Sequence, residues 1–445
     1  MDFQAIYRSK LRTPEEAVRL VKSGDWVDYS QVTSFPAALD RALAARKGEL
    51  RDVKLRCAIS MRPVQVVEQD PEGESFTYNV WHCSGLDRKY IDAGRAYFSP
   101  MLFRHCGSYY ERGYAPVNVA MVTVAPMDKH GFFSYGLTNC AQQELIDAAE
   151  HVIVEVNPHM PWIPGLEADR IHVSEVDAIV ENDEPFVHPA PVSISEVDRK
   201  IAANIFPHMR DGVTLQLGIG GMPNALGSLI AESDLKDLGM HTELMSDGYL
   251  TLYRAGKITN RKKELNRGKG VFGICNGSRE LYDFLDHNLA VLSAPMRYIN
   301  DPAVIRQFEN FVSINGCLSF DLYGQVCSET AGLRQISGTG GQLDFVTGAY
   351  EARHGMAFLA TASTFTDRQG QLHSNVLPCF TRGDVITTPR AQAPWLVTEY
   401  GAANLSGLPV WQRAEAIVSL AHPAFREELI RAAERQKIWR RSNKR

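Results

Sequence analysis

The stretch 213–252 constrains the fold of this chain more than any other. Residues 213–217 are dense in β-branched and apolar side chains, which predicts a buried strand. A glycine-rich turn follows, and residues 223–232 predict a helix with proline in its first turn. A strand that leads through such a turn into a helix N-terminus predicts an anion site, because free backbone N–H groups and the helix dipole point to one place. The next short apolar run, residues 240–245, brings Glu243 near that site.

Two nucleotide-binding motifs are excluded at this turn. A dinucleotide fingerprint requires a third glycine where Pro223 stands, and a Walker loop requires Gly-Lys-Ser/Thr, which the chain lacks. The glycines by themselves are equally compatible with a tight structural turn. An isolated glutamate such as Glu243 is more often a solvated surface charge. The turn alone therefore leaves a structural and a functional interpretation open.

The same order of elements occurs in the N-terminal half. Thr13 and Pro14 predict a helix start, residues 26–29 a strand and residues 37–45 a second helix. This order predicts two copies of one α/β domain with open, largely parallel sheets, in which ligands bind beyond the carboxyl ends of the strands. Chance similarity of two strand–helix units is the alternative. The matching segments are 23–39 with 211–226, and 119–131 with 311–324, where an apolar strand is closed by Asp-x-x-Gly.

The domain boundaries follow from length and from a proline-rich segment. A chain of 445 residues is too long for one ordinary core, so two or three domains are expected. Residues 184–192 contain three prolines and break both hydrophobic periodicities. We predict an N-terminal α/β domain over residues 1–184, a linker over 185–195, and a C-terminal α/β domain over 196–445 that carries Glu243.

Composition excludes several classes of function. The chain is 44% hydrophobic and 22% charged, with a formal net charge of −5, which is typical of an α/β enzyme and gives no basic footprint for nucleic acid. The basic tail 426–445 interleaves glutamates and predicts a solvated amphipathic helix. The N-terminus has no apolar signal region and no run is long enough to span a membrane, so we expect a cytoplasmic protein. The eight cysteines form no C-x-x-C pair and no H-E-x-x-H occurs, so we expect reduced thiols and no metal.

Several motifs, taken in their order and spacing, give the chain a family resemblance that spans nearly its whole length. It resembles the acetyl-CoA hydrolase/transferase family, the class I type of CoA-transferase, and within it the butyryl-CoA:acetate and 4-hydroxybutyrate CoA-transferases. The segments that carry the resemblance are 125–131, 216–225, the His-Thr-Glu motif 241–243, 321–326 and 337–345.

The resemblance implies a fold and a set of roles. It implies two tandem α/β domains with the active site in the cleft between them, and Glu243 as the nucleophile. It implies that the amides of Gly340 and Gly341 lie near the reacting carbonyl. It further implies that coenzyme A, a substrate and not a resident cofactor, contacts Gly220, Gly221, Met222, Pro223, Asn224, Gly341 and Gln342. A homo-oligomer is expected by analogy with the family.

The implied reaction is a ping-pong CoA transfer between a short-chain acyl-CoA and a carboxylate. A carboxylate attacks the thioester to give a mixed anhydride, and the released CoA thiolate then forms a glutamyl-CoA thioester. The site must desolvate the carboxylate and provide donors where negative charge develops. An acyl-CoA hydrolase on the same scaffold differs only in whether water enters. A non-catalytic CoA-binding protein is a further alternative, but such a protein has no need of Glu243.

Departures from the family pattern leave the substrate open. The family commonly has a lysine-containing segment where this chain has Arg353, so a role of Arg353 in CoA binding is undecided. Arg62 and Arg88 are expected near the acyl pocket, where a guanidinium suits a second substrate carboxylate. A dicarboxylate CoA-transferase, using succinyl-CoA with itaconate or acetate, is therefore an alternative. The other interpretation is that Arg62 and Arg88 are surface or ion-paired residues.

Overall fold

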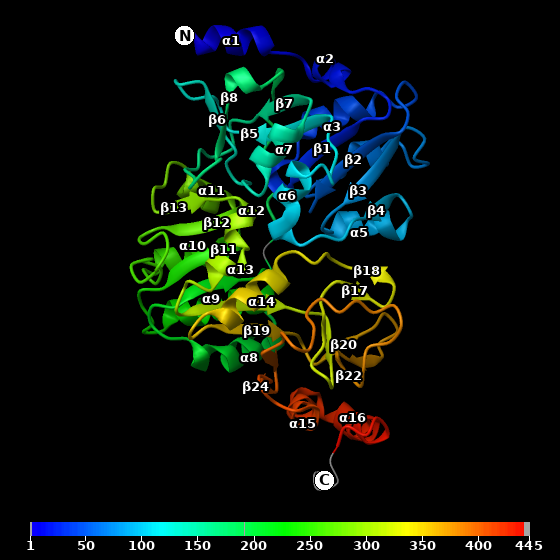
Figure 1. Cartoon of the computed structure of the whole chain (residues 1–445), viewed down its shortest axis with the longest axis vertical. Coiled ribbons are helices and arrows are strands. Elements are labelled where there is room, and N and C mark those ends of the chain that lie inside the picture. The colour runs from blue at the N-terminus through cyan, green and yellow to red at the C-terminus, as the bar shows by residue number, and fades with distance from the viewer. Residues whose placement is uncertain (1, 191, 440–445) are drawn as a thin grey trace. The chain divides into compact units, whose positions relative to one another are not determined.

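The computed structural model describes residues 2–190 and 192–439 of the chain (Figure 1). Their backbone divides into two compact units. Unit 1 comprises the described residues up to Pro189, together with Glu243–Asp247 and Gly270–Asn300. Unit 2 comprises the described residues of Ala190–Thr242, Gly248–Lys269 and Asp301–Arg445.

The N-terminal half is built on a seven-stranded sheet with the order β4-β3-β2-β1-β5-β7-β9. All six neighbouring strand pairs are parallel. The strands are β1 Trp26–Gln31, β2 Val53–Ala58, β3 Phe76–Val80, β4 Ala96–Phe98, β5 Val119–Val124, β7 His151–Val156 and β9 Ala178–Glu181. A short antiparallel pair joins β6 Phe132–Ser134 to β8 Arg170–His172. The helices are α1 Phe3–Lys10, α2 Pro14–Ala17, α3 Ala37–Ala44, α4 Gln65–Glu68, α5 Gly85–Asp92, α6 Cys106–Glu111 and α7 Gln142–Ala148.

Local sequence signals explain the first elements. Thr13 caps α2 through a capping box with Glu16, and Pro14 occupies the first helical position, as expected. The α-helix is shorter than expected, because it tightens into a 3₁₀ turn at Val18–Leu20. The strand β1 is longer than expected and extends to Gln31.

A second sheet has eight strands in the order β13-β12-β11-β10-β14-β19-β23-β24. The pairs of β10 with β11 and β14, of β12 with β13, and of β19 with β14 and β23 are parallel, whereas β24 runs antiparallel to β23. The strands are β10 Thr214–Leu217, β11 Gly239–Met245, β12 Gly270–Cys275, β13 Val291–Ser293, β14 Phe311–Gly316, β19 Met356–Ala360, β23 Trp395–Thr398 and β24 Gly401–Asn404.

The remaining elements follow the same chain order. The helices are α8 Glu196–Ile205, α9 Gly221–Glu232, α10 Asp247–Arg254, α11 Arg279–Leu285, α12 Met296–Ile299, α13 Pro302–Ile305, α14 Gln342–Glu351, α15 Val410–Leu420 and α16 Pro423–Arg435. Small sheets are formed by β15 Ser319–Asp321 with β16 Val326–Cys327 and β22 Val376–Leu377, by β17 Thr330–Ala331 with β18 Arg334–Gln335, and by β20 Thr364–Thr366 with β21 Leu372–Ser374. The expected tail helix over 426–445 is present in part as α16, which ends at Arg435, and the described residues 436–439 are not helical. Residues 440–445 of that expectation lie outside the described part of the chain.

The two main sheets confirm the α/β class and the predicted duplication. In the first sheet, β1 lies between β2 and β5, and β7 follows β5. In the second sheet, β10 lies between β11 and β14, and β19 follows β14. The same order of these four strands arises twice, as β2-β1-β5-β7 and as β11-β10-β14-β19, because the two halves repeat the same sequence of strands and crossover helices. The strand β5, buried at every position, is a nearly continuous apolar run, whereas β10 also buries the polar residues Thr214 and Gln216.

The observed units differ from a purely linear division of the chain. The break at 189/190 falls inside the expected linker 185–195, whose bounds stay a prediction. The segments 243–247 and 270–300, Glu243 included, were expected in the C-terminal domain, but the structure groups them with unit 1. Backbone hydrogen bonds account for this grouping: the N–H of Asn139 donates to Gly273, that of Cys275 to Leu137 and that of Met296 to Cys140, at 3.0, 2.7 and 2.7 Å.

None of the helices in the described part of the chain is long and apolar enough to cross a membrane. Within residues 2–190 and 192–439, no group of three or more His, Cys, Asp or Glu side chains is arranged to hold a metal ion.

Candidate active site

Glu243 lies on β11 and is half-buried. Asn300 donates a hydrogen bond from its Nδ2 to Glu243 Oε2 at 2.6 Å. Within the described part of the chain, this bond is the hydrogen bond that the Glu243 carboxylate accepts. One oxygen of Glu243 is thus held by a fixed donor, while Oε1 is left for other chemistry.

Burial dominates the electrostatics of Glu243. Desolvation raises the pKa of its carboxyl from the ordinary value of 4.5 to about 7, and the hydrogen bond from Asn300 acts in the opposite direction. Near neutral pH the protonated and ionised forms therefore coexist. An ionised carboxylate in this place is poorly solvated and has only one strong donor, which makes it a better nucleophile than a carboxylate in water.

Asn300 is placed by the short helix α12. Its side chain is fully buried, and its N–H donates to Met296 at 2.9 Å, so that it closes the helix. Arg297, on the same turn, forms ion pairs with Glu111, Glu144 and Glu167 at 3.3, 3.2 and 3.4 Å. The start of α12 is fixed as well, because its first N–H donates to Cys140. Asn300 was not among the predicted site residues, because Asn-Asp-Pro at 300–302 is typical of a turn.

The first glycine turn begins helix α9 two residues earlier than expected. Gly220 forms the N-cap of α9 with φ +125°, a backbone conformation that residues with a side chain rarely adopt. A Cβ atom at Gly221 would lie 2.4 Å from Asp198 Oδ2, so only glycine fits there. The carboxylate of Asp198 therefore already lies against this helix N-terminus, which reduces the attraction that the helix offers to a second anion. The expectation of a simple anion cradle is modified accordingly.

The second glycine turn is anchored by Glu329. The N–H groups of Ile336 and Ser337 donate to the Glu329 carbonyl at 2.8 and 3.1 Å, and Thr339 Oγ1 donates to its carboxylate at 3.0 Å. Gly340 has φ +53° and Gly341 is the N-cap of α14. The segment that follows is the helix α14.

Gln342 is the first residue of α14, and its Nε2 donates to Thr388 Oγ1 at 3.1 Å. Met222, Pro223 and Asn224 lie in the first turn of α9, where Met222 and Pro223 are buried and Asn224 is half-buried. All residues predicted to bind CoA thus belong to unit 2, whereas Glu243 and Asn300 belong to unit 1. Each turn supplies N–H groups that intrahelical bonds leave unpaired.

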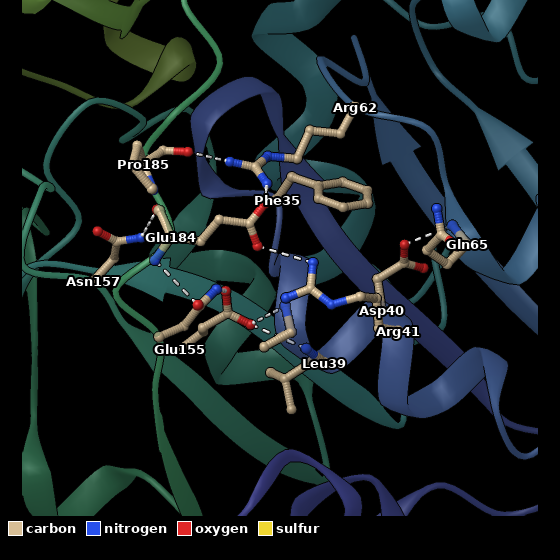
Figure 2. Close-up of polar contacts among 12 residues, drawn as sticks. Phe35, Leu39, Asp40, Arg41, Arg62, Gln65, Glu155, Asn157, Glu184 and Pro185 are labelled. Carbon is tan, nitrogen blue, oxygen red and sulfur yellow. Dashed lines mark hydrogen bonds and ion pairs between the residues drawn. The ribbon is translucent and has the colours of Figure 1, made fainter.

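Arg62 is occupied by an ion pair. Its Nη1 contacts Glu184 Oε1, and its Nη2 donates to the carbonyl of Pro185. Arg41 holds the other oxygen of Glu184 at 2.9 Å, so the carboxylate lies between two guanidinium groups (Figure 2). Together they lower the pKa of Glu184. This geometry agrees with the ion-paired interpretation of Arg62 and removes the structural reason to place a second substrate carboxylate on it.

The other two arginines considered in the sequence lie elsewhere. Arg88 lies half-buried on α5. The burial of His82, and after it the charge of Arg88, lowers the pKa of His82 to about 4. Arg353 is exposed and pairs with Glu309 at 3.3 Å. A substrate role for Arg88 and a CoA role for Arg353 both stay predictions.

The two Asp-x-x-Gly motifs close loops. Asp128 Oδ1 accepts from the N–H groups of His130 and Phe132, at 2.8 and 2.9 Å. Asp321 Oδ1 accepts from the N–H groups of Tyr323 and Gln325, both at 3.0 Å. At 321–326 this hydrogen bonding explains the turn without any ligand.

Comparison with known proteins gives consistent matches over the whole chain. The N-terminal domain of the acetyl-CoA hydrolase/transferase family matches residues 1–189, and the C-terminal domain of that family matches residues 277–433. The butyryl-CoA:acetate CoA-transferase of Anaerostipes caccae is 46% identical over 446 residues, which covers 100% of both chains. The 4-hydroxybutyrate coenzyme A transferase of Clostridium kluyveri is 37% identical and covers 97% of this chain and 98% of its own. The crystal structure of RipA from Yersinia pestis superposes with a TM-score of 0.91 at 36% identity, covering 98% of this chain and 100% of that one.

Proposed function

Since this chain belongs to the acetyl-CoA hydrolase/transferase family, we propose that it transfers coenzyme A from a short-chain acyl-CoA to a carboxylate through a thioester on Glu243. The protein is a CoA-transferase. Its relatives are named for butyryl-CoA with acetate and for 4-hydroxybutyrate, which supports short-chain substrates. We further propose that the protein is a cytoplasmic homo-oligomer.

The observation that carries this proposal is the environment of Glu243. A glutamate that serves only as a surface charge is solvated, whereas this one is desolvated and has a pKa of about 7. A single short hydrogen bond from the buried Asn300 orients it. A strongly perturbed carboxyl with one oxygen held and the other uncommitted fits a nucleophile.

The chemistry proceeds by two exchanges at this carboxylate. Glu243 Oε1 attacks the thioester carbonyl and expels the CoA thiolate, which leaves a mixed anhydride between the acyl group and Glu243. The thiolate then attacks the glutamyl carbonyl carbon and expels the acyl group as a carboxylate, giving the glutamyl-CoA thioester. An incoming carboxylate reverses both steps and leaves with CoA. No net water is consumed, so the free energy of the thioester is conserved.

Asn300 has a defined part in this sequence. When the thiolate attacks Glu243, negative charge develops on Oε2, the atom to which Asn300 Nδ2 donates. A donor at such a position typically contributes ~2.7–4 kcal/mol to the transition state. The amides of Gly340 and Gly341 are assigned to the oxygen of the acyl carbonyl. The N-terminal turn of α9, Gly220–Asn224, and the start of α14, Gly341 and Gln342, are assigned to CoA, with N–H groups as donors.

A covalent adduct tests the proposal directly. The enzyme is mixed with butyryl-CoA without an acceptor, and its intact mass is measured before and after borohydride reduction. We expect a CoA adduct that borohydride converts to an alcohol on the peptide containing Glu243. Glu243→Gln should give no adduct and no transfer, while Glu415→Gln, the same change at an exposed carboxylate of α15, should behave as the wild type.

Two outcomes would contradict the proposal. Transfer by Glu243→Gln at the wild-type rate would withdraw the nucleophile. Release of free CoA that does not depend on acetate, with no adduct on the protein, would identify a hydrolase. The dicarboxylate alternative predicts efficient use of succinyl-CoA, but its candidate residue Arg62 is already paired with Glu184.

A further inference from the structure

The carboxyl ends of β1 and β2 contain a group of strained residues outside the machinery described above. Ser30, Val32 and Ile59 have φ values of +56°, +49° and +55°. Glycine tolerates this left-handed conformation, but a β-branched residue such as Val32 or Ile59 adopts it only when its surroundings force it to. The register of the β1–β2 pair shifts between Asp28 and Gln31, so the strand bulges at this point. A bulge next to a functional site changes the direction of a side chain. Here the side chain at the end of the bulge is that of Gln31.

The bulge is fixed by polar contacts on both sides of Gln31. Ser30 Oγ contacts Gln142 Oε1, and Gln142 Nε2 donates to Ser34 Oγ at 2.8 Å. Thr33 Oγ1 lies 2.9 Å from Thr138 Oγ1. Gln142 therefore contacts residues on both sides of Gln31: its amide oxygen accepts from the Ser30 hydroxyl, and its amide nitrogen donates to the Ser34 hydroxyl.

Gln31 itself is left with an unmet acceptor. Its side chain is 3% exposed, and Oε1 has no hydrogen-bond partner among residues 2–190 and 192–439. A buried amide oxygen without a donor destabilises the fold, so a persistent one calls for an explanation. The strained residues Ser30 and Val32 thus flank Gln31, whose own backbone is extended. Gln31 carries the unsatisfied oxygen, to which no described residue provides a donor.

The loop 140–142, whose Gln142 contacts residues on both sides of Gln31, also borders the candidate nucleophile Glu243. Cys140 lies two residues before Gln142, and its carbonyl accepts from the first N–H of α12, the helix that ends in Asn300. Cys140 is also within electrostatic reach of Glu243. All of these residues belong to unit 1. A short loop therefore connects the bulge on β1 with the support of Glu243, at the edge of the sheet where parallel strands place their ligands.

We propose that Gln31 determines acyl specificity by accepting a hydrogen bond from a hydroxyl group on the acyl chain, so that the preferred substrates are short hydroxyacyl thioesters and hydroxycarboxylates. This inference rests on the proposed function and refines its substrate class. A plain hydrocarbon chain has no donor to offer and would leave Oε1 unpaired. A second carboxylate offers only acceptors to that oxygen. A hydroxyl supplies the missing donor, and sites built for a hydroxyl reject analogues that lack it.

Acceptor selectivity tests the assignment. With acetyl-CoA as donor, kcat/KM is measured for butyrate, 3-hydroxybutyrate, 4-hydroxybutyrate and succinate. The variant Gln31→Met keeps the length of the side chain and removes the acceptor. Gln307→Met makes the same change at an exposed position on unit 2 and serves as the matched control. For the wild type we expect the better hydroxybutyrate to exceed butyrate by about tenfold, and for Gln31→Met we expect that ratio to fall by about tenfold.

The outcomes separate this inference from the proposed function. A wild type that uses butyrate at least as well as both hydroxybutyrates overturns the inference, and it does so even if the variant fails to fold. A fall of the ratio smaller than about threefold in a folded Gln31→Met, with all acceptors affected alike, assigns Gln31 a structural role and also overturns it. Absence of transfer to every carboxylate, with no adduct on Glu243, would instead contradict the proposed function.

Discussion

Replacing Glu243 by glutamine should stabilise the protein in a pH-dependent way while abolishing its activity. Glutamine has the shape of the carboxylic acid and keeps an oxygen that can accept from Asn300 Nδ2. It removes the ionisation that burial opposes. The pKa of the Glu243 carboxyl rises from 4.5 to about 7 in the folded protein, so the native state binds this proton more tightly than the unfolded chain does.

The sign and size of the effect follow from that rise. A raised folded pKa contributes stability that is present below pH 4.5, declines between pH 4.5 and about 7, and is absent above. At about 1.36 kcal/mol per pKa unit, full ionisation lowers the free energy of unfolding by about 3.4 kcal/mol. The loss is about 1.4 kcal/mol near pH 5.5 and reaches its full value near pH 8. The advantage of Glu243→Gln over the wild type should therefore grow by about 2 kcal/mol between these two values of pH.

Thermal unfolding at two pH values measures this difference. For a unit of this size, about 2 kcal/mol corresponds to a difference of roughly 4–8 °C in Tm. Equal scan rates are needed, since chains of this length often unfold irreversibly. Glu415→Gln, the same change at an exposed carboxylate, should shift Tm equally at both pH values. A Tm advantage of Glu243→Gln that is the same near pH 5.5 and near pH 8 would refute the desolvation argument.

Three further predictions concern the surroundings of the site. Asn300→Ala should lower kcat by about 10²–10³. It should also move the acidic limb of the pH–rate profile to higher pH, because the hydrogen bond that lowers the pKa of Glu243 is lost, and an unmoved limb would contradict this. Gly221→Ala should raise the KM for CoA by about tenfold, because the added Cβ has no room beside Asp198. The control Gly227→Ala lies in the same helix, where an added Cβ has its nearest contact at 3.9 Å, and it should keep that KM and raise stability by about 0.5–1 kcal/mol. Equal KM values for the two variants would contradict the assignment of this turn to CoA. Arg62→Gln should reduce stability by about 1 kcal/mol and leave the succinate-to-acetate ratio unchanged, with Arg41→Gln as the matched control; a selective loss of succinate would restore the dicarboxylate alternative.

Local sequence rules predicted much of the fold. The alternation of apolar strands with capped helices specified the α/β class, and the repeated order predicted two similar sheets, which the strand orders around β1 and β10 confirm. The helix start at Pro14 was readable because a capping box is a local hydrogen-bond pattern. The bounds of α2 and α9 were harder to predict from the sequence, because the 3₁₀ turn after Ala17 and the helical conformation of Gly221 depend on packing.

The sequence by itself determined the duplicated α/β scaffold, the glycine positions at its turns and the His-Thr-Glu motif that singles out Glu243. Only the tertiary structure decided how that glutamate behaves. Its hydrogen bond comes from Asn300, 57 residues further along the chain, and its raised pKa comes from burial. Likewise, Glu184 forms an ion pair with Arg62, which lies 122 positions away in the sequence. The hydrogen bonds to the residues on both sides of Gln31 come from the distant Gln142. Propensity and periodicity are properties of neighbouring residues, whereas desolvation, ion pairing and unmet hydrogen bonds are set by which distant segments pack together.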